Sequence, residues 1–232
     1  MSMRIEISES DLAALVCRQL ESLFLPLAAA EKACLADMMR RALPRCEHCY
    51  LHTRIKRYAE NGVAVFNPYH SGQYAVFLYF MASAVGKQAA PEFRSLADRL
   101  YFLNKALNGL ELYHEVEMPS IFMMDHPVGT VIGRAEFSDY FSFSQNCTVG
   151  NNWDKYPRLG HHVAMLAGSK LIGDCRVGDH VILAANTCVI DTDIPDGCIV
   201  FGSSPNLTFK SRPVSFFESW FATAGGVKPD AT

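Results

Sequence analysis

Two groups of side chains in this sequence have residue types and spacing that could do chemistry. The first is centred on His126, which directly follows Asp125 and precedes Pro127. Because an imidazole accepts a proton near neutral pH, His126 is a candidate general base. The residues alone leave an equal alternative, in which His126 only forms a turn, as we expect for His162 and His180.

The second group is Cys46 and Cys49, with His48 and His52 beside them. This spacing is typical of one half of a zinc site. A structural zinc site needs a second pair of ligands, and the sequence contains no second pair at ligand spacing. We therefore expect no metal, and we interpret the two cysteines as ordinary residues near the start of a helix.

The composition of the chain excludes several classes of function. Of its 232 residues, 50% are hydrophobic and 19% are charged, so we expect a sizeable folded core. The formal net charge of -3 favours neither nucleic acid nor an anionic membrane as a partner. The apolar stretch from Tyr74 to Val85 is too short to span a membrane. Eight cysteines without a signal-peptide pattern predict a reducing, cytoplasmic location.

Residues 1–110 have helical periodicity and are expected to form an N-terminal helical domain. The pattern predicts helices at Ser8–Pro26, Ala28–Leu43, Glu47–Tyr58, Ser71–Gly86 and Pro91–Leu107. Ser8 and Asp11 resemble a capping box, and Pro44 is expected to stop the second helix. The Asn61-Gly62 pair predicts a turn. The aromatic residues between Tyr74 and Phe80 are expected to be core.

Residues 111–210 follow a rhythm of six residues. Aliphatic, aromatic or methionine side chains recur at this spacing, at Val131, Phe137, Phe143 and Val149 and again at Leu159, Met165, Leu171, Val177, Leu183 and Val189. Residue types that tolerate positive φ follow three positions later, at His162, Gly168, Asp174, His180 and Asn186. Cys147 and Cys175 occupy small inward positions. This period predicts a triangular coil of parallel strands with about four turns.

These residues resemble the hexapeptide-repeat acyltransferases, which build a left-handed parallel β-helix. Ile132-Gly133, Leu159-Gly160 and Val177-Gly178 match their repeat, and Met124–Gly133 is similar to the segment that carries the catalytic histidine of serine O-acetyltransferases. Asp193–Gly197 and Val200–Pro205 follow in the same order as in that family. The resemblance implies an α+β fold, with the helical domain before the β-helix and a C-terminal tail at residues 211–232.

The resemblance implies transfer of an acetyl group from acetyl-CoA to a hydroxyl, directly and without an acyl-enzyme, as in cysteine biosynthesis. His126 would be the base, and Asp125 would contact the acceptor. A carboxylate usually orients such a base. The family spacing points to Glu111 for this role, with Glu115 and Glu117 as rivals.

The sequence departs from the family where the acceptor binds. Lys155-Tyr156 replaces an arginine and a histidine after the inserted loop, and lysine offers a point charge without the bidentate fork of arginine. The acceptor is therefore L-serine, a sugar or another small metabolite. The alternative hypothesis is that the protein is a trimeric scaffold without catalytic activity. His70 could approach the acceptor, but we favour a loop in which Ser71 caps the following helix.

The resemblance also implies positions for acetyl-CoA and for assembly. The expected cofactor-binding residues are Gly150, Asn151, Ala167, Gly168, Lys170, Gly202 and Lys210. The two lysines are candidates because Asn206 occupies a position where the family commonly has a basic residue. We expect a homotrimer or a dimer of trimers, with exposed aromatic side chains between Phe137 and Phe143. The polar end Val227–Thr232 has no apolar anchor, so we expect no complex with a cysteine synthase.

Overall fold

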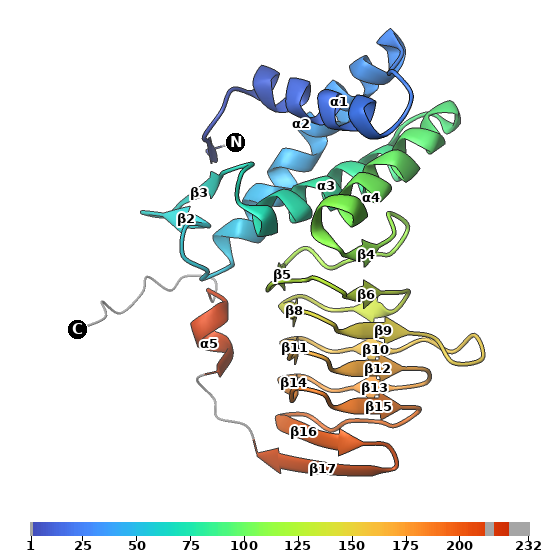
Figure 1. Cartoon of the computed structure of the whole chain (residues 1–232). Coiled ribbons are helices and arrows are strands. Elements are labelled where there is room, and N and C mark those ends of the chain that lie inside the picture. Colours follow the sequence, from blue (N-terminus) through green and yellow to red (C-terminus); the bar gives the residue numbers. More distant parts are fainter. Residues whose placement is uncertain (1, 212–215, 223–232) are drawn as a thin grey trace.

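The computed structural model describes residues 2–211 and 216–222, and it shows a layer of helices on one end of a stack of strands (Figure 1). The helices are α1 (Glu9–Leu23), α2 (Ala29–Leu51), α3 (Ser71–Gln88) and α4 (Arg94–Asn108), with a 3₁₀ turn at Pro91–Phe93. A small sheet, β1 (Arg4–Ile5), β3 (Val63–Phe66) and β2 (Ala59–Glu60), packs beside them. In the described part of the chain, no helix is both long and apolar enough to cross a membrane.

Most of the predicted helices are confirmed. The Ser8 hydroxyl accepts a hydrogen bond from the Asp11 backbone N–H at 3.0 Å and so begins α1. Gly109 ends α4 with a φ of 60°. The aromatic residues of α3 are core, since Phe77 and Phe80 are both 0% exposed. This helix is therefore the centre of the helical layer.

The prediction that Pro44 ends the second helix is wrong, because α2 continues through it to Leu51. A proline inside a helix removes one backbone hydrogen bond and costs about 3 kcal/mol. The residues that follow, Cys46, Cys49 and Tyr50, are at most 1% exposed. Burying them against α3 and the strands offsets the cost of the proline.

The predicted helix at Glu47–Tyr58 is also wrong in its second half. Its first residues belong to α2, and its last residues lead into the hairpin of β2 and β3. Asn61 and Gly62 form the hairpin turn, with φ values of 51° and 78°. The turn signal was therefore correct, although it joins strands rather than ending a helix.

The second half of the chain is a β-solenoid with three faces of parallel strands. Face one is β4 (Glu111–Leu112), β6 (Val131–Ile132), β9 (Thr148–Gly150), β12 (Lys170–Ile172) and β15 (Cys188–Ile190). Face two is β7 (Glu136–Phe137), β10 (Arg158–Leu159) and β13 (Arg176–Val177). Face three is β5 (Phe122–Met124), β8 (Phe141–Phe143), β11 (Val163–Met165), β14 (Val181–Leu183) and β16 (Cys198–Ser203). Face one stacks five strands, so the solenoid has about five turns, one more than the repeat predicted.

The six-residue ladder is confirmed over its regular part. Side chains from Leu159 to Val189 at that spacing are at most 5% exposed, as are the inward residues Cys147 and Cys175. The ladder fails at Val131, which is 39% exposed, while its neighbour Ile132 is 1% exposed. The inward position on this strand therefore lies five positions before Phe137 instead of six.

Two further expectations about the solenoid are wrong. Asp174 does not have a positive φ; Gly173, with a φ of 83°, turns that corner because it has no Cβ. Phe141 and Phe143 are 0% exposed inside the coil and are not surface residues as predicted, whereas Phe137 and Tyr140 are partly exposed. The Tyr140 ring packs edge-on against Phe221, with 5.4 Å between the ring centroids.

The C-terminal part of the described chain closes the fold. β17 (Asn206–Ser211) pairs antiparallel with β16 at the far end of the solenoid. Helix α5 (Phe216–Trp220) then lies beside face three (Figure 1), where Phe217 and Phe221 pack against Met123 and Ile182. The expectation about Val227–Thr232 falls outside the described residues.

Candidate active site

The corner that carries His126 is wider than the other corners between faces three and one. Eight positions separate Met124 from Ile132, whereas six separate Phe143 from Val149 in the turn below. The regular corner resumes at Gly129, whose backbone N–H donates to the Gly109 carbonyl at 2.9 Å. The two extra residues therefore bulge outward at His126, and the inward residue of the following strand is Ile132, five positions before Phe137.

The wide corner is held by its neighbours on both sides. Thr130 Oγ1 donates to the Ser144 carbonyl at 2.8 Å and accepts from the Cys147 backbone N–H at 3.1 Å. A Cβ on Gly129 would lie 2.2 Å from Asn146 Oδ1, and the φ of Gly129 is 75°, so this position requires glycine. The loop is thus a rigid part of the solenoid wall, which suits a residue that must be positioned for chemistry.

The structure brings His126 and Asp125 together at this corner. His126 has a φ of 50° and its side chain is 85% exposed, while Asp125 is partly buried. His126 Nε2 lies 3.6 Å from Asp125 Oδ1. This distance is longer than a hydrogen bond but short enough for the carboxylate to stabilise a protonated imidazole. The arrangement leaves the ring open to a substrate.

The three candidate orienting acids are each paired with a cation. Glu111 begins face one, where its backbone N–H donates to the Thr130 carbonyl at 2.9 Å, and its carboxylate lies 2.6 Å from Lys105 Nζ. Glu115 pairs with Arg94 at 2.7 Å, and Glu117 pairs with a lysine of α3. Among the described residues, Asp125 is the only carboxylate in ion-pair contact with His126.

The two predicted acceptor residues lie on a loop away from this corner. The loop between β9 and β10 projects from the stack of strands (Figure 1). Lys155 Nζ lies 3.3 Å from Asp174 Oδ2, and Tyr156 is partly buried. Trp153 on the same loop is 89% exposed. Within the one chain described, no contact joins this loop to His126.

The predicted acetyl-CoA residues divide into two groups. Gly150 ends β9 and Asn151 follows it. Ala167 and Gly168 lie at the corner before β12, and Lys170 begins that strand, where its Nζ donates to the Gly168 carbonyl at 3.2 Å. Gly202 and Lys210 lie apart from these, in the β16–β17 hairpin, where Lys210 Nζ lies 5.4 Å from the centre of the Phe201 ring. Because the strands of face one stack in register, the first group shares one side of the solenoid.

The helical layer contributes His70, but in a different way from the prediction. His70, rather than Ser71, is the N-cap of α3, and its Nδ1 accepts from the Gln73 backbone N–H at 3.4 Å. Ser71 is instead the first helical residue. Burial lowers the pKa of His70, which keeps the imidazole neutral and able to accept this hydrogen bond.

The cysteine pair, Cys46 and Cys49, is buried in the last turns of α2. Among the described residues, no group of three or more His, Cys, Asp or Glu side chains could hold a metal ion. Burial raises the pKa of the Cys49 thiol to about 12, and the thiol donates to the Phe122 carbonyl at 3.1 Å. The thiol therefore stays protonated and joins α2 to β5.

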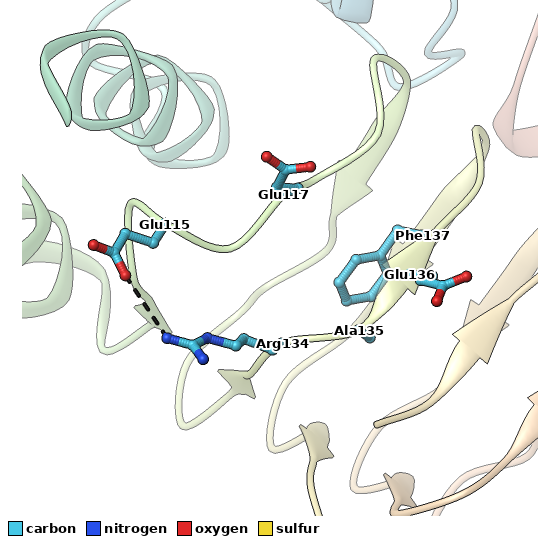
Figure 2. A pocket seen from close by; sticks show the side chains of 6 residues that line it. All are labelled: Glu115, Glu117, Arg134, Ala135, Glu136 and Phe137. Carbon is cyan, nitrogen blue, oxygen red and sulfur yellow. Dashed lines mark ion pairs between the residues drawn. The ribbon is translucent and has the colours of Figure 1, made fainter. Parts of the chain in front are cut away.

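A groove of about 410 Å³ lies near the first turn of the solenoid (Figure 2). Its lining includes Glu115 and Arg134, whose charged groups are 3.8 Å apart, together with Glu117, Glu136 and Phe137. Apart from the two rival acids, none of the predicted site residues lines this groove. It is a feature separate from the His126 corner.

The widened corner that frames the site was not predicted from the sequence. The spacing of eight between Met124 and Ile132 was a readable signal, because every later corner between these faces keeps six.

Comparison with known proteins agrees with this geometry. The serine acetyltransferase of Helicobacter pylori is 30% identical over 148 residues, which cover 62% of this chain and 84% of that protein. A solved serine acetyltransferase in complex with CoA has a TM-score of 0.62 at 17% identity, covering 87% of this chain and 84% of that chain. Another, in complex with cysteine, has a TM-score of 0.66 at 18% identity, covering 93% and 84%. No protein-family model matches the chain. The identity and coverage of the Helicobacter relative show that this chain belongs to the serine acetyltransferase family.

Proposed function

We propose that His126 is the general base of this acetyl-CoA-dependent O-acetyltransferase, and that its acceptor is a small amino acid, with L-serine the first candidate. The observation that carries the proposal is the widened corner, which presents an exposed imidazole 3.6 Å from a carboxylate. The relatives named above are serine acetyltransferases, and solved neighbours hold CoA and cysteine.

The proposed reaction is a direct transfer. The acceptor hydroxyl loses its proton to His126 while its oxygen attacks the thioester carbonyl of acetyl-CoA. The carbon–sulfur bond then breaks, and the CoA thiolate takes the proton back from the imidazolium. Asp125 stabilises the imidazolium by charge and provides an anion for the acceptor's amino group. This balance requires no metal and no covalent enzyme intermediate.

The proposed acetyl-CoA site runs along face one. Gly150 has open space at its α-carbon, since an added Cβ would meet no atom within 4 Å. A pantetheine arm could therefore lie against this backbone. Lys170, which begins β12 in the next turn, is exposed and offers a cation to a phosphate. Gly202 and Lys210 form a second group that would reach the adenosine end.

The orienting acid and the assembly also belong to the proposal. Glu111 would have to leave Lys105 to reach His126, so Asp125 is the better supported carboxylate. An imidazole that is 85% exposed in one chain is poorly shielded from water. A second copy packed over this corner, in a trimer or a dimer of trimers, would complete the site. A cytoplasmic location and a role in cysteine biosynthesis stay predictions.

The experiment that tests the proposal is release of free thiol from acetyl-CoA. L-serine, a panel of sugars and other hydroxylated metabolites would be compared as acceptors, with His126→Ala as the control. Thiol release with L-serine that depends on His126 supports the proposal. Release of thiol only with a sugar would show that the acceptor is a sugar and not L-serine. Equal rates for the wild type and a folded His126→Ala protein would refute the base.

The second candidate function, a scaffold without activity, is favoured by one observation. Lys155 and Tyr156 make no contact with the His126 corner in the described chain, and Lys155 is paired with Asp174. Failure of the wild type to release thiol with any acceptor, together with unchanged melting on adding acetyl-CoA, would support this reading.

A further inference from the structure

The last turns of α2 carry two histidines on their outer side, while the cysteines between and before them are buried. Cys46 and Cys49 are at most 1% exposed, whereas His48 is exposed and His52 is partly exposed. The two histidines stand at positions i and i+4 of the chain, so their side chains are neighbours on the helix surface. The helix therefore divides the Cys–His motif into a buried thiol pair and an outer imidazole pair.

The two imidazole rings are close enough to bind one ion. Their centroids are 4.6 Å apart, and their planes are inclined at 51°. Two nitrogens that each bind a zinc ion at about 2.0–2.1 Å lie no more than about 4 Å apart. Rings at this separation can therefore direct one nitrogen each at a common metal ion. Two histidines at i and i+4 on one helix face are a known arrangement for binding zinc.

A hydrogen bond to the backbone fixes which nitrogen of His52 is available to a metal. His52 Nδ1 lies 2.8 Å from the carbonyl oxygen of His48. A carbonyl oxygen can only accept, so Nδ1 carries the proton and the neutral ring keeps its lone pair on Nε2. Metal-binding histidines are usually oriented in this way, with the other ring nitrogen donating to a carbonyl or a carboxylate. His52 therefore has the ring orientation of a ligand before any metal binds.

The end of α2 also provides a suitable charge for a cation. The last carbonyl groups of a helix carry a partial negative charge, and His52 is the C-cap residue of α2. The basic residues that flank the pair in the sequence are directed elsewhere. The Arg45 guanidinium lies 4.2 Å from the centre of the Phe80 ring, and Arg54 donates to the Glu218 carbonyl at 2.7 Å. Both arginines therefore leave the imidazole pair open to a cation.

We propose that His48 and His52 form a surface site for a divalent transition metal that prefers nitrogen ligands, such as Zn²⁺ or Ni²⁺. The two imidazoles fill two coordination positions, and water fills the others. This open site differs from a closed four-ligand zinc centre, for which the sequence has no second pair of ligands. The Cys49 thiol takes no part, because it donates to the Phe122 carbonyl on the other side of the helix. The site is independent of the acetyl transfer.

A metal at this position would stabilise the seam between α2 and the C-terminal part of the described chain. The His52 carbonyl accepts from the Ala222 N–H at 2.9 Å, and the Arg54 N–H donates to the Trp220 carbonyl at 2.8 Å. Binding to the folded chain alone raises its stability, because the two imidazoles are held together only while α2 is helical. The last turn of α2, to which Trp220 and Ala222 are bonded, is then held more firmly.

Isothermal titration calorimetry of the untagged protein with NiCl₂ tests the site. We expect one tightly bound Ni²⁺ per chain. His48→Ala and His52→Ala should each weaken this binding roughly tenfold or more, because the remaining imidazole loses the advantage of a linked partner. His161→Ala is the matched control, since His161 is exposed but lies at a corner of the solenoid instead of on a helix. This variant should bind Ni²⁺ as the wild type does.

Two further measurements locate the metal. In a Trp153→Phe background Trp220 is the remaining tryptophan, and Ni²⁺ should quench its fluorescence only while both histidines are present. Ni²⁺ should also raise the urea midpoint of the wild type and leave that of His52→Ala unchanged. Equal Ni²⁺ affinity in the wild type and in the His48→Ala/His52→Ala double variant would overturn the proposal, because the metal would then bind elsewhere. A wild type that gives no binding signal with NiCl₂ would overturn it as well.

Discussion

A pair of adjacent substitutions, Ile132→Ala and Val131→Ala, tests the shifted register that follows the His126 corner. The six-residue repeat places Val131 inside the coil, whereas the structure buries Ile132 to 1% exposure and leaves Val131 39% exposed. The two residues are neighbours on one strand and point to opposite sides of the wall. The two hypotheses therefore predict opposite orders of stability.

The size of the effect follows from the packing. Ile132 lies between Leu112 and Val149 on the strands that flank it, and both are at most 2% exposed. Replacing a buried isoleucine by alanine costs about 2–5 kcal/mol. Backbone hydrogen bonds on both sides keep the neighbours from closing the cavity, so we expect about 3–5 kcal/mol for Ile132→Ala. Val131→Ala should cost less than about 1 kcal/mol.

Urea unfolding followed by far-ultraviolet circular dichroism measures both values, with equal m-values as the condition for comparing them. For a chain of this length, the loss at Ile132 corresponds to a fall in melting temperature of roughly 6–20 °C. If Val131→Ala proves as costly as Ile132→Ala, the eight-position spacing from Met124 to Ile132 is wrong, and the description of the His126 loop must change with it.

Three further predictions concern the site and the helical layer. His126→Ala should lower kcat/KM by about 10² to 10⁴-fold without lowering the melting temperature, because the side chain is exposed; a thiol-release assay checks this. Gly150→Ala should leave stability unchanged, since nothing lies within 4 Å of the new Cβ, but it should raise the KM for acetyl-CoA severalfold; an unaltered KM would place the pantetheine arm elsewhere. Because the pKa of His70 is lowered in the folded protein, the unfolded chain binds a proton at His70 more readily. The stabilisation that neutral His70 provides is therefore complete above about pH 6.5 and is lost as the pH falls below that value. His70→Asn, which keeps a good helix cap, should therefore show a smaller fall in urea midpoint between pH 7.5 and pH 5.5 than the wild type, and equal falls would contradict this reasoning.

The solenoid could be predicted from the sequence because its stabilising contacts repeat locally. Each inward side chain, such as Leu171, packs on the residues one turn above and one turn below, so a strict spacing is enough to identify the coil. Helix ends with local signals, such as Ser8 and Gly109, were readable for the same reason. The Asp125-His126 pair was identified because its segment is continuous in sequence.

The remaining features depend on residues far apart in the chain, and only the tertiary structure decided them. Pro44 stays inside α2 because the turns after it are buried, with Cys49 bonded to the carbonyl of Phe122 across the junction with the solenoid. Glu111 matched the family spacing, yet its nearest cation is Lys105 of α4. No local periodicity encodes such contacts, since their free energy comes from burial and charge between elements that meet after folding.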